Sequence, residues 1–228
     1  MIAQMFRSLH PDFQHRWEIY ESVLKESLTP ETVWLDIGCG KNEMVAKMGK
    51  HAKSALGTDI VNDPDRTDAP FLLSDLHSIP LPSGYATLIT LRMVVEHLPR
   101  GADDLLDICT LLAPGGKLII LTTNKLSPIV LLPSVLPYRV KSWVIQKLFG
   151  VREHDIFPTH HRFNTRRLMV RGLSGMTLLQ LWHVEEVPLN KPFLALLFGM
   201  WFTFVEMPGL KSLRSNLLAV YQKSLRTM

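Results

Sequence analysis

The sequence predicts an α/β protein in which helices cover both faces of a mostly parallel sheet. Short apolar runs typical of strands alternate with helical segments, and a glycine turn follows the first of these runs. Three of the runs lead to an aspartate. Because ligands of such sheets bind at the carboxyl ends of the strands, these aspartates are candidate ligand contacts.

The composition is that of a folded, weakly basic protein. Of its 228 residues, 46% are hydrophobic and 20% are charged, which excludes general disorder. The net charge of +4 is spread along the chain, so we expect no nucleic-acid partner. Cys39 and Cys109 lie too far apart to indicate a disulfide framework, and residues 1–7 lack a secretory pattern. We therefore expect a cytoplasmic protein.

Residues 1–28 are expected to form a helical cap. Apolar side chains recur at helical spacing from Phe6 to Leu24, with an interruption at Pro11. Packing against the domain is the simplest interpretation of this pattern. A lid over the ligand and a membrane-facing surface are the alternatives.

The segment 33–42 predicts a buried strand, a glycine turn and a helix that runs from residue 43 to 50. Gly38 and Gly40 permit backbone conformations closed to other residues and let a ligand lie against the main chain. Asp36, near the strand end, can accept hydrogen bonds from a ligand amine or from the turn. Glu43 occupies the third-glycine position of the dinucleotide fingerprint and would repel a pyrophosphate, which argues against NAD.

The second and third strands also lead to carboxylates. Asp59 follows the glycine turn by about twenty residues, where a carboxylate can accept two hydrogen bonds from a ribose diol. Alternatively, Asp59 only starts the next turn. The third strand is predicted over residues 71–76 and to end in Asp75, which could accept an adenine amine while Leu76 packs on the ring.

Two further strands and a helix complete the alternation. We expect strands at 85–90 and 117–123, with a helix at 102–112 between them that stops at the Pro-Gly-Gly turn of residues 114–116. The stretch 91–98 lies where the fourth strand passes into a helix. It therefore also falls on the carboxyl edge of the sheet.

These stretches resemble, in order and spacing, the class I S-adenosylmethionine-dependent methyltransferases over residues 33–123. The matching pieces are residues 35–40, 57–59, 74–76 with 79–84, 95–98 and 111–118. The resemblance implies a Rossmann-like, seven-stranded, mostly parallel sheet whose last strand inserts antiparallel between the fifth and sixth. Asn42 departs from the family, which often has a third glycine there, but asparagine tolerates left-handed backbone angles.

The resemblance also implies roles for the cofactor, S-adenosylmethionine. Asp36 and the backbone from Gly38 through Cys39 to Gly40 would hold its methionine part. Asp59 would bind the ribose hydroxyls, and Ile60 would pack on the adenine. Asp75 would take the adenine amine, with Leu76 beside it.

His97 is the candidate general base, because imidazole titrates near neutrality and a hydroxyl acceptor must lose a proton. The alternative is that His97 only shapes the pocket at a helix start. Glu96 and His97 are adjacent in sequence and make a poor ligand set, so we assign no metal there.

The second half contains two apolar stretches and a polar, histidine-rich link. The stretches 129–147 and 193–205 indicate buried packing, contact with another subunit, contact with a membrane surface, or an apolar tunnel for the substrate. The second stretch is too short to span a bilayer. His160, His161 and Arg162 are candidates to face the acceptor. Strands are expected at 177–184 and 216–223.

We therefore expect one methyltransferase domain. Its parts are the cap (1–28), the cofactor core (33–123), a substrate-cap insertion (124–165), and a C-terminal part (166–228) with an apolar insertion (191–214).

The expected reaction is methyl transfer to a hydroxyl of a small lipophilic or lipid-linked molecule, in the cytoplasm or on the inner face of the membrane. A non-catalytic cofactor-binding or membrane-associated protein is the alternative, and a glycan or RNA methyltransferase a lesser one. The sequence leaves the acceptor and the oligomeric state open.

Overall fold

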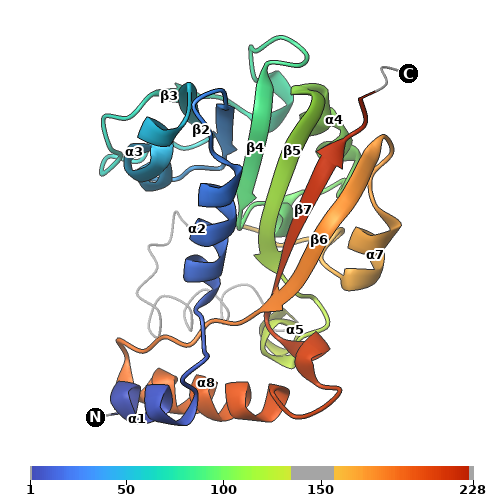
Figure 1. Ribbon diagram of the computed structural model, residues 1–228. Helices are drawn as coiled ribbons and strands as arrows, with labels where there is room; N and C mark the ends of the chain where they lie inside the picture. The colour runs from blue at the N-terminus through green and yellow to red at the C-terminus, as the bar shows by residue number, and fades with distance from the viewer. Residues whose placement is uncertain (1, 135–156, 226–228) are drawn as a thin grey trace.

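The centre of the molecule is a seven-stranded sheet. The computed structural model describes residues 2–134 and 157–225 (Figure 1). The strand order is β3-β2-β1-β4-β5-β7-β6, with β7 antiparallel to both of its neighbours and the other pairs parallel. This confirms the predicted Rossmann-like sheet with its antiparallel last strand. The strands are β1 (Val33–Ile37), β2 (Ser54–Asp59), β3 (Phe71–Leu73), β4 (Ala86–Arg92), β5 (Leu112–Thr123), β6 (Met176–Val184) and β7 (Asn216–Lys223).

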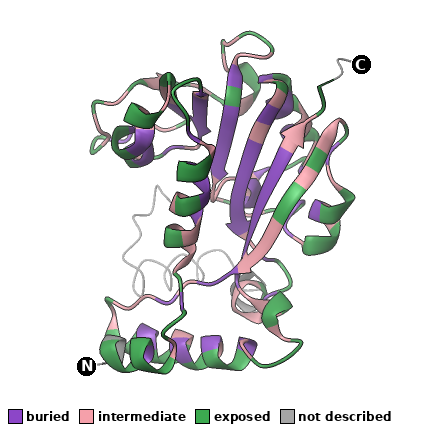
Figure 2. Ribbon diagram, viewed as in Figure 1, coloured by how far each residue is buried: buried purple, intermediate pink, exposed green. Residues whose placement is uncertain are grey.

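Helices cover both faces of the sheet, and the inner strands are the most deeply buried part of the molecule (Figure 2). On one face, α2 (Arg16–Ser27) and α3 (Glu43–Met48) pack on a cluster that contains Trp34 and Leu88. On the other face, α4 (Ala102–Thr110) and α7 (Arg166–Arg171) enclose a cluster that contains Ile89 and Tyr221. The remaining described elements are α1 (Ile2–Leu9), α5 (Pro128–Ser134), α8 (Pro192–Val205), and the short 3₁₀ helices η1 (Gly49–His51), η2 (Leu76–Ser78), η3 (Val95–His97) and η5 (Lys211–Leu213).

The N-terminal segment forms two helices that lie in different layers. The chain leaves the helical conformation after Leu9, and α2 begins at Arg16 with a capping box in which the Glu18 carboxylate accepts a hydrogen bond from the His15 N–H at 2.8 Å. Of the two helices, α2 packs on the sheet, whereas α1 pairs with α8 below the lower end of the sheet (Figure 1). The segment is therefore both a domain helix and part of a separate layer.

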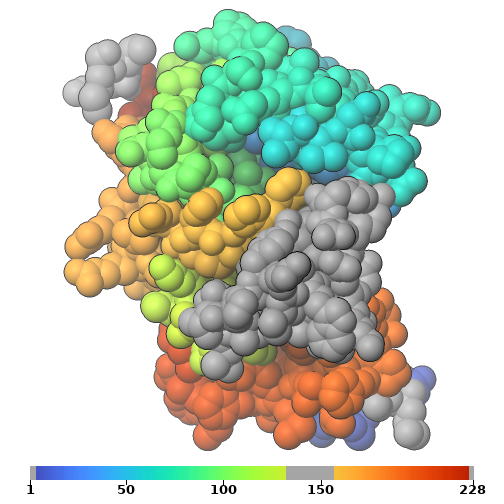
Figure 3. All heavy atoms as spheres, turned by 180° about the vertical axis from the view of Figure 1, so that it is seen from behind, coloured from blue at the N-terminus to red at the C-terminus, as the bar shows by residue number. Residues whose placement is uncertain are grey.

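The α1–α8 layer lies at the edge where the parallel strands end. Its core contains Phe6, Phe13, Val187 and Phe202, and the His10 Nε2 lies 2.9 Å from the Thr203 Oγ1. Seen from behind, the C-terminal segments (orange to red) form the lower part of the molecule, beneath the green and teal sheet domain (Figure 3). Residues 191–214 form α8 and η5 between β6 and β7.

Three predicted strand boundaries were wrong, and the helices predicted to end at residues 50 and 112 end at Met48 and Thr110. The third strand ends at Leu73 instead of Asp75, because the Asp75 side chain caps η2. The fourth strand continues to Arg92. The fifth begins at Leu112, which pairs with Ala86, and its register shifts before Lys117 pairs with Leu88. The Pro-Gly-Gly stretch therefore forms an irregularity inside a strand instead of a turn between elements.

Candidate functional site

The glycine turn after β1 has the left-handed backbone that its sequence predicts. Gly38 has φ 70°, Gly40 has φ 55° and Asn42 has φ 59°. A Cβ on Gly38 would lie 2.2 Å from the Val94 Cγ2, whereas a Cβ on Gly40 would meet nothing within 4 Å. The backbone at Gly40 is thus exposed and open to a ligand.

Asn42 fixes the turn against the chain that leads into β3. Its side chain is buried, and its Nδ2 donates hydrogen bonds to the carbonyl oxygens of Ala69 at 3.1 Å and Pro70 at 3.0 Å. A glycine could adopt the same backbone angles but would lose both bonds. The departure from the family pattern therefore keeps the turn and adds an anchor.

Asp36 is a buried carboxylate with one oxygen in use. The Thr90 Oγ1 donates to its Oδ1 at 2.5 Å and in turn accepts a hydrogen bond from the Trp34 Nε1 at 2.8 Å. Among the described residues, the Asp36 Oδ2 has no hydrogen-bond partner. Burial raises the pKa of Asp36 to about 6, and the positive charge of Arg92 acts in the opposite direction. A cationic ligand group at Oδ2 would complete this site.

Asp59 ends β2 and holds the glycine turn from the other side. Its Oδ2 accepts a hydrogen bond from the Gly40 N–H at 2.8 Å, and its Oδ1 accepts one from the Val61 N–H at 3.0 Å. Each carboxylate oxygen has a further lone pair for a ligand hydroxyl. Ile60 beside it is 56% exposed, which leaves an apolar surface next to the carboxylate.

The other three predicted cofactor positions differ in character. Asp75 is exposed, and its Oδ1 accepts a hydrogen bond from the His77 N–H at 2.9 Å, while Leu76 packs partly against the core. Cys39 is buried, and burial raises the pKa of its thiol to about 12, so the thiol is neutral near pH 7. Cys39 therefore contributes packing and backbone to the turn.

His97, the candidate base, is oriented by a backbone carbonyl. Its Nδ1 lies 2.8 Å from the Pro158 oxygen, and its ring meets Phe157 edge-on at 5.8 Å. Because a carbonyl oxygen can only accept, this contact places the proton of the neutral ring on Nδ1. The Nε2 lone pair is then available to accept a proton.

Glu96 was missed as a site residue, although it precedes His97. Its carboxylate is buried and accepts a hydrogen bond from the Thr122 Oγ1 at 2.6 Å, and burial raises its pKa. Its backbone carbonyl accepts hydrogen bonds from the N–H groups of His160 at 2.7 Å and His161 at 3.1 Å. Glu96 thus ties the histidine-rich link to the end of β4.

The three predicted substrate-side residues lie in different environments. His160 and Arg162 are exposed, and the backbone of Arg162 lies against Gly101. His161 is buried with φ 49°, and its Nδ1 is 3.2 Å from the Thr123 Oγ1 at the end of β5. The His161 side chain is therefore held at the carboxyl edge of the sheet.

A second polar network at this edge involves the start of α2. The Arg16 guanidinium donates to the Asn216 Oδ1 at 2.7 Å and forms an ion pair with Glu186. Glu185 accepts hydrogen bonds from the Ser215 N–H at 3.0 Å and from the Trp201 Nε1 of α8 at 3.1 Å. No short motif marks these residues, because their partners lie far away in sequence.

A cluster of metal-ligand residue types lies outside this site. Ligand atoms of His77, Asp104 and Asp107 lie within 4.8 Å of one another. Arg100 forms ion pairs with Asp104 at 2.8 Å and with Asp107 at 2.6 Å. The acidic groups already have a cation, so we assign no metal to them.

Comparison with known proteins agrees with this geometry. Residues 9–171 match the family described as "Methyltransferase domain". The chain is 25% identical over 175 residues to a ubiquinone biosynthesis O-methyltransferase of Aeromonas salmonicida. The aligned region covers 70% of this chain and 68% of that protein.

Solved structures share the fold at low identity. An S-adenosylmethionine-dependent methyltransferase from Mesorhizobium loti is 17% identical with a TM-score of 0.59, covering 91% of this chain and 97% of that one. The [4+2]-cyclase SpnF is 14% identical with a TM-score of 0.59, covering 94% of this chain and 86% of that one.

The residues present fit S-adenosylmethionine. The partnerless oxygen of buried Asp36 suits an ammonium group, the open backbone at Gly40 admits a close ligand, and Asp59 offers lone pairs to hydroxyls. The matched family covers more than half of the chain. The protein therefore belongs to the methyltransferase domain family and is an S-adenosylmethionine-dependent methyltransferase.

Proposed function

We propose that the protein transfers the methyl group of S-adenosylmethionine to a hydroxyl of a small lipophilic molecule. The observation that carries this proposal is the orientation of His97, whose Nδ1 is held by the Pro158 carbonyl so that Nε2 can accept the hydroxyl proton. The O-methyltransferase name of the Aeromonas salmonicida relative supports the same acceptor atom.

The chain's own residues divide the work between two sets. When bound, the cofactor supplies an electrophilic methyl group on its sulfonium sulfur. Asp36 and the backbone of residues 38–40 hold the methionine part, Asp59 holds the ribose hydroxyls, and Ile60, Asp75 and Leu76 contact the adenine. On the acceptor side, His97 removes the proton, and Glu96 positions the link that carries His160, His161 and Arg162. Alignment of the two reactants and exclusion of water then account for most of the catalysis.

His97→Ala tests the proposed chemistry. We expect kcat to fall about 100-fold or more, because general-base catalysis contributes 10²–10⁴-fold, while the Kd for S-adenosylmethionine changes less than about twofold. Formation of S-adenosylhomocysteine would be measured with a panel of phenolic and quinol acceptors. His51→Ala is the matched control, since His51 is exposed at the end of η1.

Two outcomes would contradict the proposal. Unchanged turnover in His97→Ala would remove His97 from the mechanism. Binding of S-adenosylmethionine without methylation of any acceptor would favour the non-catalytic alternative.

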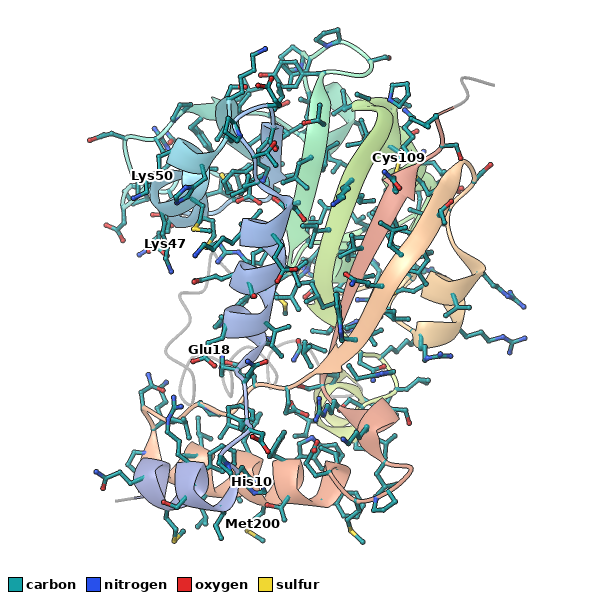
Figure 4. The ribbon with its side chains drawn as sticks, viewed as in Figure 1. His10, Glu18, Lys47, Lys50, Cys109 and Met200 are labelled. Atoms are coloured by element: carbon teal, nitrogen blue, oxygen red, sulfur yellow. The ribbon has the colours of Figure 1, made fainter. Side chains whose placement is uncertain are left out.

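We further propose that one face of the α1–α8 layer contacts a lipid surface, from which a lipophilic acceptor would be taken. Phe193 is 66% exposed and Met200 is 65% exposed, while Phe202 on the opposite side of the helix is buried. Figure 4 places Met200 at the lower edge of the molecule, away from the sheet. Further exposed apolar residues of this layer are Met5, Leu9, Leu196, Leu197 and Phe204.

The charge and length of these helices fit surface contact. Neither α1 nor α8 contains an acidic residue. None of the helices in the described residues combines the length and hydropathy needed to cross a bilayer. Within the predicted stretch 129–147, Leu131 is 45% exposed, and residues 135–147 lie outside the described residues.

Sedimentation with vesicles of the zwitterionic lipid phosphatidylcholine tests this contact. We expect the wild type to co-sediment and Phe193→Lys/Met200→Lys to lose about tenfold or more of its partitioning, because each change removes apolar burial. Leu179→Lys on the exposed edge of β6 is the matched control. If the wild type stays in the supernatant, the lipid proposal is wrong. If the wild type is a dimer and the double variant is a monomer, this face of the α1–α8 layer binds a second copy of the chain instead.

A further inference from the structure

Arg92 ends β4 as a half-buried cation without an ion-pair partner among the described residues. Its guanidinium carbon lies 5.5 Å from the centre of the Trp17 ring. Within residues 2–134 and 157–225, no carboxylate forms an ion pair with it. Partial burial of an unpaired charge is unfavourable, and a planar guanidinium suits a carboxylate with two parallel hydrogen bonds. Arg92 is therefore poised for an anionic ligand group.

The neighbouring cations are already neutralised. Arg16 is paired with Glu186 and bonded to Asn216. Lys47 of α3 forms an ion pair with Glu21 of α2 at 2.7 Å. An anion that enters beside these helices would therefore find its free partner in Arg92.

A hollow of about 310 Å³ adjoins Arg92. It lies between α2 and α3 at the end of β4, and its lining includes Trp17, Tyr20, Glu43 and Met44. The last two residues begin α3, directly after the glycine turn. The hollow thus adjoins the part of the turn that is expected to hold the methionine end of the cofactor. Glu21 and Glu43 also line it, and of these Glu21 is neutralised by Lys47.

Asp36 and Arg92 lie on the same face of the sheet. Side chains two residues apart in a strand lie on the same face of the sheet, so Arg92 shares a face with Thr90. The Thr90 hydroxyl donates a hydrogen bond to Asp36, which places Asp36 on that face as well. The paired strands place Ile37 beside Leu91, and the next residues along are Gly38 and Arg92. The charge of Arg92 also acts on the Asp36 carboxyl. Within the described part of the chain, a buried acid with one partnerless oxygen and a base without an ion pair therefore lie close together at the turn.

We propose that Arg92 binds the carboxylate of the amino-acid end of S-adenosylmethionine while Asp36 Oδ2 binds its ammonium group. This inference rests on the cofactor-binding role proposed for Asp36 and the glycine turn. An α-amino acid carries both charges on neighbouring atoms, and the two residues supply the opposite charges on one face of the sheet. Arg92 is thus a cofactor-binding residue that selects ligands with a free carboxylate.

Calorimetric titration with three ligands tests the proposal. S-adenosylmethionine carries both charged groups, decarboxylated S-adenosylmethionine keeps the amine, and 5′-methylthioadenosine lacks both. We expect Arg92→Ala to raise the Kd for S-adenosylmethionine about 10- to 100-fold, as for a lost charge-assisted pair, and to leave the other two Kd values unchanged. Asp36→Asn should weaken the first two ligands and spare the third. Arg171→Ala, an exposed change of the same charge on α7, is the control.

Three outcomes would overturn the proposal. The first is an unchanged Kd for S-adenosylmethionine in Arg92→Ala, and the second is an equal loss for all three ligands. The third is a wild type that binds none of them when thermal unfolding shows that it is folded. A different result would separate the two proposals. If no hydroxyl acceptor is methylated, but Arg92→Ala raises the Kd for S-adenosylmethionine alone, the proposed acceptor is wrong and this inference stands.

Discussion

The carboxyl edge of the sheet has two halves that are built in different ways. The cofactor half, made of Asp36, residues 38–40 and Asp59, is joined by contacts such as that of Gly40 with Asp59, 19 residues apart. The proposed acceptor half contains Glu96 and His97 and the adjoining network of Arg16, Glu185 and Asn216, and it is joined by contacts such as that of Arg16 with Asn216, 200 residues apart. A local site leaves a motif in the sequence, whereas a site assembled from distant segments does not.

The halves also differ in what their acids do. Asp36 keeps one oxygen without a partner among the described residues, whereas both oxygens of Glu185 accept hydrogen bonds from the protein. The first acid therefore has an oxygen that a ligand could use, whereas the second holds α8 and the start of β7 to the sheet. Removal of the Asp36 carboxylate should therefore weaken ligand binding, whereas removal of the Glu185 carboxylate should lower stability.

Glu185→Ala should give the largest loss of stability. It leaves the buried Ser215 N–H and the Trp201 indole without acceptors, and each such group costs about 1–3 kcal/mol. We expect the free energy of unfolding in urea to fall by roughly 3–5 kcal/mol, with the Kd for S-adenosylmethionine within twofold at 25 °C. If Glu185→Ala had the stability of the wild type, or if it were stable but failed to bind S-adenosylmethionine, the two halves would not differ as proposed.

Gly38→Ala should give the next largest loss, and Gly40→Ala isolates its cause. Both positions have positive φ, but only at Gly38 does the new Cβ meet a neighbour, the Val94 Cγ2 at 2.2 Å. Positive φ costs alanine about 1 kcal/mol, and overpacking adds about 1–3 kcal/mol. We expect urea unfolding to show a loss of roughly 2–4 kcal/mol for Gly38→Ala and about 1 kcal/mol for Gly40→Ala. Equal losses would mean that backbone strain alone limits the turn.

The fold and the cofactor half could be predicted because their signals are local. Alternation of strands and helices gave the sheet, and the resemblance of residues 33–123 gave its antiparallel last strand, which the topology confirms. The left-handed angle at Asn42 followed from its residue type. Asp75 was misplaced in a strand because its capping bond to the His77 N–H depends on a turn that the apolar run conceals.

The acceptor half could not be predicted because its partners are set by tertiary packing. Arg16 belongs to a helix with ordinary periodicity, and only the folded chain brings it to Asn216 and Glu186. Glu96 was weighed as a metal ligand with His97, yet the fold uses its carboxylate for Thr122 and its carbonyl for the histidine-rich link. Its position beside the candidate base was the one signal available.

The smallest expected effect is a pH dependence that belongs to the cofactor half. Burial raises the pKa of Asp36 to about 6, above its ordinary 3.8. Between these values the folded protein holds a proton that the unfolded chain releases, so the stability contribution of Asp36 falls as pH rises from about 4 to about 6. An ammonium ligand requires the ionised carboxylate, so binding should change in the opposite direction.

We therefore expect the Kd for S-adenosylmethionine to be about tenfold higher at pH 5 than at pH 7, because one pKa unit corresponds to about 1.4 kcal/mol. Titration calorimetry at these two pH values measures it, with 5′-methylthioadenosine as the ligand that lacks the ammonium. Burial also raises the pKa of Glu185. Because Glu185 lies in the acceptor half, Glu185→Ala should show the same change of Kd with pH as the wild type. Asp36→Asn should bind weakly and without pH dependence. If the Kd of Asp36→Asn changed with pH as much as that of the wild type, a group other than Asp36 would be responsible for the pH dependence.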